Sequence, residues 1–135
     1  VLPMFVRHRR AARLRDFEAQ LPDAVDLIAR ALRAGHALTT GLQMVADELD
    51  SPIADEFRPL DEEQNYGLSL QDALRRFADR VPLLDARFFV TAVLTQRDAG
   101  GNLAEVLDNL ASVIRERFRV RRQVRVISTH GRMTG

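Results

Sequence analysis

Apolar residues recur at intervals of three and four along most of the chain, which is the spacing of one face of an α-helix. Leu103, Leu107, Leu110 and Ile114 follow one another in this way. No run of β-branched residues alternates with polar ones in the two-residue period of a strand. The pattern predicts an all-α protein in which Leu103, Leu107 and Leu110 are buried, together with Phe88, which opens the longest apolar run.

Prolines and glycines divide this pattern at regular intervals. Pro22, Pro52 and Pro82 each stand where a helical pattern begins, a position at which proline costs no backbone hydrogen bond. The helices that they open are expected to end at glycines, which adopt left-handed caps without strain. The spacing predicts an antiparallel bundle of about six helices in three hairpins, formed by residues 22–34 with 38–49, 52–66 with 69–80, and 82–99 with 102–126.

A similar short frame follows each of these glycines, with two leucines four residues apart. In two copies a capping residue stands two positions after the glycine, as Ser69 does before Asp72 and Asn102 before Glu105. We interpret these residues as structural marks of helix ends. The predicted turns and caps are Gly35, Gly67, Ser69, Gly100, Gly101 and Asn102.

The chain before Pro22 predicts an additional amphipathic helix near residues 4–19. Leu14, Phe17 and Leu21 share one face of it. Because no glycine separates it from the next segment, we expect it to bend at Pro22 and not to fold back. Pro59, inside the third predicted hairpin helix, is expected to kink or split that helix.

Charge is distributed unevenly behind a net value of +1. All 20 basic residues are arginine; residues 1–15 carry five of them and no acid, and residues 115–135 carry seven against Glu116 alone. The segment between them holds eight arginines and 18 acids. The chain is therefore predicted to have an acidic body with two basic ends.

The basic ends are the strongest functional signal. The last helix has a basic amphipathic pattern that suits an anionic membrane surface and equally suits nucleic acid phosphates. Two basic ends favour juxtamembrane segments, since arginine concentrates beside the cytoplasmic ends of membrane helices. We divide the chain into a juxtamembrane basic helix (1–20), a helical bundle (21–114) and a basic extension of the last helix (115–135) leading toward a transmembrane segment absent here. The predicted membrane-proximal residues are Arg7, Arg9, Arg10, Arg13, Arg15, Arg117, Arg119, Arg121, Arg122 and Arg125.

Recognisable catalytic or metal-binding chemistry is missing from the sequence. There is no cysteine, and His8, His36 and His130 are too scattered to form a spaced ligand motif. Gly100-Gly101 lacks the Lys-Ser/Thr of a phosphate-binding loop. The acids of residues 47–63 are best explained as a solvated face, although a divalent-cation site there stays open. We expect no catalytic, cofactor-binding or metal-binding residue, and hence no enzyme.

Three segments in register resemble a known family. They are LPDAVDLIARALRAGHAL (21–38), GLSLQDAL (67–74) and QRDAGGNLAEVL (96–107). Over residues 17–133 the chain resembles the type II secretion system F domain family, and within it the tight-adherence pilus B proteins. The resemblance implies a non-catalytic platform domain without a cofactor, on the cytoplasmic face of the bacterial inner membrane. The implied partners are a cytoplasmic secretion ATPase, a paralogous platform protein and an anionic membrane surface; a homo-oligomer is allowed, and nucleic acid is not expected.

Two other classes remain as alternatives at this point. The 30-residue proline spacing suggests a helical-repeat scaffold, although the tryptophan of tetratricopeptide repeats is missing. The arginine-rich ends suggest a nucleic-acid-binding helical domain, which salt-sensitive retention on heparin without ATPase binding would favour.

Overall fold

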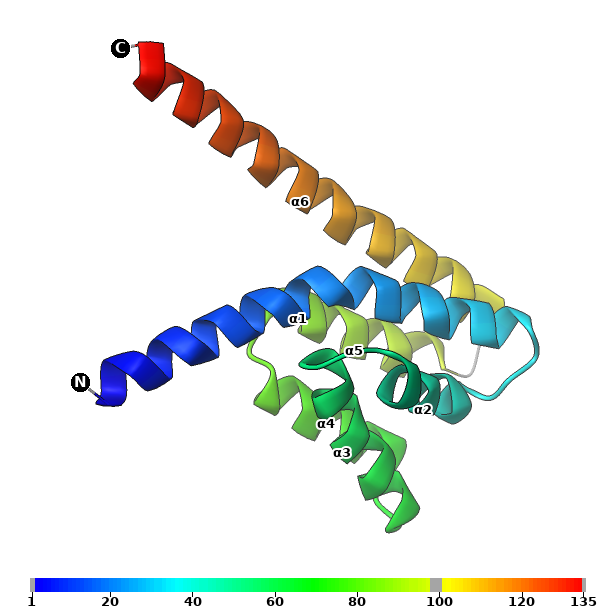
Figure 1. Cartoon of the computed structure of the whole chain (residues 1–135). Helices are drawn as coiled ribbons and strands as arrows, with labels where there is room; N and C mark the ends of the chain where they lie inside the picture. Colours follow the sequence, from blue (N-terminus) through cyan, green and yellow to red (C-terminus); the bar gives the residue numbers. More distant parts are fainter. Residues whose placement is uncertain (1, 98–100, 135) are drawn as a thin grey trace.

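The computed structural model describes residues 2–97 and 101–134, with side chains for residues 10–97 and 102–123. Within these residues the chain forms six α-helices and no strand (Figure 1), so the predicted all-α bundle is confirmed. The helices are α1 (Leu2–Arg33), α2 (Leu38–Glu48), α3 (Ile53–Asn65), α4 (Leu70–Arg80), α5 (Leu84–Gln96) and α6 (Gly101–Thr134).

The two long helices, α1 and α6, form the backbone of the bundle. They run antiparallel, because Arg33 pairs with Asp108 near one end of the contact and Glu18 pairs with Arg121 near the other. Figure 1 shows them side by side at the first of these ends and parting toward Leu2 and Thr134, which lie on the same side of the bundle. In a linear helical repeat the first and last helices do not touch. The extensive α1–α6 contact therefore excludes a repeat scaffold.

Four phenylalanines join the helices in the core: Phe17 of α1, Phe57 of α3, Phe77 of α4 and Phe89 of α5. All are at most 2% exposed. The rings of Phe57 and Phe77 meet edge to face with centroids 5.0 Å apart, and Phe89 packs against both. Such pairs contribute about 0.5–1.5 kcal/mol each beyond the area they bury. This cluster fixes the start of the bundle portion of α1 against the α3–α4 hairpin.

Burial in α6 follows the predicted stripe, whereas burial in α5 does not. Leu103 and Leu107 are buried, and Leu110 is partly buried against the core. Phe88 is 48% exposed, so the prediction that it is buried was wrong. Successive helical residues point about 100° apart. Phe89, and not Phe88, faces the aromatic cluster.

The predicted helix boundary at Pro22 is absent, because α1 continues from Leu2 to Arg33 with the proline inside it, and the chain does not fold back there, as expected. A proline within a helix costs about 3 kcal/mol. On either side of it, however, Phe17, Leu21, Val25 and Ile28 are buried on one face. Each such side chain contributes about 1.5–3 kcal/mol, which outweighs the lost hydrogen bond. The separate helix predicted near residues 4–19 is thus the first half of α1.

The remaining helix boundaries show where proline and glycine act. Pro52 and Pro82 lie just before α3 and α5, while α3 runs unbroken through Pro59, contrary to a split. Gly35 and Gly67 have φ values of +92° and +100°, in the left-handed region that favours glycine. Each completes a turn in which the next residue's N–H bonds a carbonyl five positions back, at 3.0 Å for His36 and 2.9 Å for Leu68.

The two predicted N-caps differ in outcome. The Ser69 hydroxyl oxygen accepts a 3.1 Å hydrogen bond from the N–H of Asp72, so it caps α4. Asn102 does not stand before its helix, because α6 already begins at Gly101. Helix ends shift by a residue or two with local geometry, which the capping motif alone does not fix. Gly100 lies outside the described residues.

Candidate functional site

Some of the predicted basic residues of α1 and α6 gather where these two helices diverge. Here Arg15 and Glu18 of α1 face Phe118, Arg121 and Arg122 of α6 around a pocket of about 240 Å³. A second pocket of about 290 Å³ lies on the other side of Phe118. It is lined by Ala19, Pro22, Asp23, Arg115, Phe118, Arg119 and Arg122. We call the region formed by Arg15, Phe118, Arg119, Arg121 and Arg122 the basic fork.

Phe118 is the apolar centre of the fork. It follows Ile114 by one helical turn on the inner stripe of α6 and is partly buried against the core. The guanidinium of Arg121 lies over its ring, 5.6 Å from the centroid, and also donates a 2.7 Å hydrogen bond to Glu18. A cation over an aromatic face is worth about 0.5–1 kcal/mol at an exposed site. The hydrogen bond to Glu18 joins α6 to α1 immediately before they diverge, and the contact with Phe118 positions the Arg121 side chain for it.

Several arginines of the C-terminal stretch form ion pairs with carboxylates of other helices in the bundle. Arg115 contacts Asp26 at 2.6 Å and Asp23 at 2.9 Å, and these carboxylates raise the pKa of Arg115 above its ordinary value. Arg117 pairs with Asp85, which is only 4% exposed. A carboxylate as buried as that requires a paired charge. Arg115 and Arg117 therefore serve the fold.

Fewer arginines are free to bind a partner than the sequence predicted, because several form ion pairs within the chain. Arg10, Arg15 and Arg122 are exposed and have no ion pair among the described side chains, while Arg119 reaches Glu116 only at 3.9 Å. Arg13 pairs with Asp55 at 3.0 Å across to α3. The structure brings Arg15 and Arg122 together and places Arg10 and Arg13 on another side of α1. The side chains of Arg7, Arg9 and Arg125 lie outside the described residues.

The acids that neutralise α6 were missed at the level of sequence. Glu18, Asp23 and Asp26 lie along one stretch of α1, and their partners on α6 are about a hundred residues away. A signal was present in the order of the charges: Glu18 comes before Asp23 and Asp26 in α1, and their partners follow in reverse, with Arg115 of the two aspartates before Arg121 of Glu18. Reading that signal required knowing that the first and last helices pair.

The described residues hold no recognised catalytic or metal-binding arrangement. No group of three or more His, Asp or Glu side chains among them is placed to hold a metal ion. Of the three histidines, only His36 has a described side chain, and it is exposed after α1. Over the same residues, no helix combines the length and the apolarity needed to cross a bilayer.

Comparison with protein families identifies the class. The model of the family described as type II secretion system (T2SS), protein F matches residues 24–135. This match spans most of the chain, including α2 to α6 and α1 from residue 24 onward, so the chain belongs to that family. Proteins of the family are non-catalytic inner-membrane platform proteins of secretion and pilus systems. No curated protein and no solved structure gives a significant match to the chain.

Proposed function

We propose that this chain is the cytoplasmic-face domain of a tight-adherence pilus platform protein, with no catalytic activity of its own. In this proposal it couples a secretion ATPase to pilus assembly and works beside a paralogous platform protein. The family match supports the platform role. The observation that carries the orientation is that α1 and α6 leave the bundle toward the same side (Figure 1). Arg15 and Arg122 line one pocket where the two helices part.

The basic fork is proposed to face the anionic inner leaflet. An arginine near an anionic surface gains about 1 kcal/mol, and this gain falls off within a Debye length. Arg15 and Arg122 have no carboxylate partner among the described side chains. In this proposal lipid phosphates act as their anionic partners. The ends of α1 and α6 would then continue toward the bilayer on either side of the fork.

The ATPase is proposed to contact the acidic side of the bundle. Asp47, Glu48 and Glu62 are exposed on α2 and α3, and α3 with α4 projects away from α6 (Figure 1). An anionic leaflet repels these carboxylates, which turns them toward protein partners. Tyr66, at the tip of the α3–α4 hairpin, is 90% exposed and adds an amphipathic aromatic contact to this side.

The test is a pull-down of the secretion ATPase encoded nearby with the immobilised 135-residue chain. We expect retention by the wild-type chain and loss with the double variant Asp47→Arg/Glu62→Arg. Asp16→Arg is the matched control, since it reverses an exposed acid on α1 beside the fork. No retention of the ATPase at low salt, combined with salt-sensitive retention on heparin, would instead favour a nucleic-acid-binding domain.

A further inference from the structure

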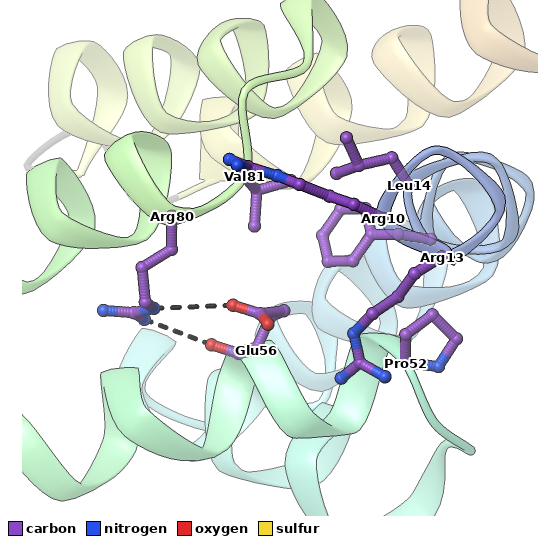
Figure 2. Close-up of a pocket in the computed structure, with 8 residues that line it drawn as sticks. Arg10, Arg13, Leu14, Pro52, Glu56, Arg80 and Val81 are labelled. Atoms are coloured by element: carbon purple, nitrogen blue, oxygen red, sulfur yellow. Dashed lines mark hydrogen bonds and ion pairs between the residues drawn. The ribbon is translucent and has the colours of Figure 1, made fainter. Parts of the chain in front are cut away.

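A separate pocket of about 340 Å³ lies on the side of α1 that faces α3 and α4, away from the basic fork (Figure 2). Its apolar lining consists of Phe17 and Val81, which belong to the core, with Pro52 and half-buried Leu14 beside them. The volume is at the lower end of the range for ligand pockets. It admits a few side chains and not a folded element.

Charged side chains surround this apolar floor. Arg10 and Arg13 reach in from α1, and Arg80 and Glu56 face them from the end of α4 and the start of α3 (Figure 2). Arg80 is held by Glu56 at 3.5 Å and by Glu63 at 3.0 Å. Arg13 has one exposed carboxylate partner, on α3. Arg10 has none among the described side chains.

The distribution of these pairs leaves one positive charge unmatched. Arg13 shares Asp55 with Arg58, and Arg80 pairs with Glu56 and shares Glu63 with Arg76. Of the three arginines that line the pocket, Arg10 is thus the one without a carboxylate partner among the described side chains. Glu56 lies in the same lining and repels additional negative charge, so the pocket favours a single carboxylate over a strongly anionic surface. A single carboxylate next to apolar side chains fits, because it supplies the missing partner while its neighbours cover the floor.

We propose that this pocket docks an acidic side chain carried on an apolar segment of a protein partner. The carboxylate lies between the guanidinium groups of Arg10 and Arg13, and the flanking apolar side chain packs on Leu14 and Val81. The docking site lies on a different side of α1 from the basic fork.

The experiment is a titration of the isotopically labelled 135-residue chain with short peptides, followed by backbone amide NMR shifts. The probe is acetyl-Leu-Glu-Leu-Leu-amide, and its matched control carries Gln in place of Glu. We expect the Glu peptide to shift amides near Arg10, Leu14 and Val81 and to bind about tenfold more tightly than the Gln peptide, as a charged hydrogen-bond partner predicts. Equal affinity for both peptides, or shifts centred elsewhere, would overturn the proposal.

Variants of Arg10 separate docking from general electrostatics. Arg10→Gln should weaken the Glu peptide about tenfold, while Arg30→Gln, roughly 30 Å further along the same helix, should not. Arg10→Glu should reverse the preference toward acetyl-Leu-Lys-Leu-Leu-amide. Dihexanoyl phosphatidylglycerol, soluble as a monomer, tests the lipid alternative. Shifts of the same amides by this lipid but not by the Glu peptide would show a headgroup site and refute peptide docking.

Discussion

Leu107 is a fully buried residue of α6. It has no exposed surface and lies one turn after Leu103 on the stripe that packs against the core. Val113, on the same helix, is 54% exposed. The two positions therefore compare a buried and an exposed site within one helix.

We expect Leu107→Ala to lower the free energy of unfolding by about 2–5 kcal/mol, because the site cannot collapse around the deleted methyl groups. Val113→Ala, the control, should change it by less than about 0.5 kcal/mol. Urea denaturation followed by circular dichroism measures both. A loss under about 1 kcal/mol for Leu107→Ala would mean that the stripe faces a partner and not the core.

Asp61 is a residue at which the fold tolerates an unfavourable charge. Partial burial raises its pKa above the ordinary value, and the nearby carboxylates of Asp47 and Glu62 raise it further. A carboxyl whose pKa is higher in the folded state destabilises the fold when ionised. The penalty is complete above the folded-state pKa and disappears as the pH falls below the ordinary Asp value.

Asp61→Asn should consequently stabilise the chain at pH 7, by about 0.5 kcal/mol for this half-buried site. The advantage should shrink as the pH approaches 4, near the ordinary pKa of aspartate. Thermal unfolding of both chains across this pH range measures the difference. Asp79→Asn, at an exposed position on α4, provides the comparison. An advantage for Asp61→Asn that grows on acidification would contradict this sign.

Neighbouring residues in α5 show how far burial can be predicted from sequence. Between Phe88 and Leu94 Thr91 is the one polar side chain, so the sequence marks the outward face of this run at a single position. The choice of Phe89 over Phe88 is made by the aromatic cluster from α1, α3 and α4, which is tertiary information. In α6, by contrast, Glu105, Asp108 and Asn109 alternate with the apolar positions, and the stripe could be predicted correctly.

At the scale of elements, the local sequence determines where helices end at glycine, but it does not determine whether a helix continues through proline. The glycines after α1 and α3 adopt positive φ because they have no Cβ, which is a property of the residue itself. The continuity of α1 through Pro22 depends instead on burial against distant helices. Local rules predict a break there, and long-range packing overrides them.

Gly35 offers a test of the local rule. A Cβ at this position meets no atom within 4 Å, so any cost of a side chain comes from the backbone alone. We expect Gly35→Ala to destabilise the chain by about 1 kcal/mol, the cost of a left-handed residue with a Cβ. Gly35→Asn should cost less, since asparagine tolerates this region. If alanine proves neutral in chemical denaturation, the turn after α1 must be able to adopt another conformation.

At the scale of the whole molecule, the pairing of α1 with α6 determines which charges are available. The sequence predicted two basic ends, and the structure shows that Arg115, Arg117 and Arg121 pair with carboxylates of α1 and α5. These partners lie 32 to 103 residues away in sequence, beyond the reach of any local pattern. Arg15 and Arg122, left without such partners among the described side chains, then meet at the fork.

The fork leads to a prediction for membrane binding by the 135-residue chain. We expect it to bind vesicles containing phosphatidylglycerol and to bind neutral phosphatidylcholine vesicles far more weakly. The double variant Arg15→Glu/Arg122→Glu should lose about 2 kcal/mol or more of binding free energy, because each arginine near the surface contributes about 1 kcal/mol. The double variant Arg30→Glu/Arg75→Glu carries the same charge change at exposed positions away from the fork and should lose much less.

Salt distinguishes this arrangement from apolar insertion. The Debye length falls from about 10 Å at 0.1 M to about 3 Å at 1 M salt, so binding through the fork should weaken steeply over that range. Vesicle co-sedimentation at increasing salt measures the loss. Binding that persists at high salt, or that is equal on neutral vesicles, would show that apolar contacts and not Arg15 and Arg122 hold the chain at the bilayer. The proposed orientation, with the acidic α2–α3 side toward protein partners, would then lose its electrostatic basis.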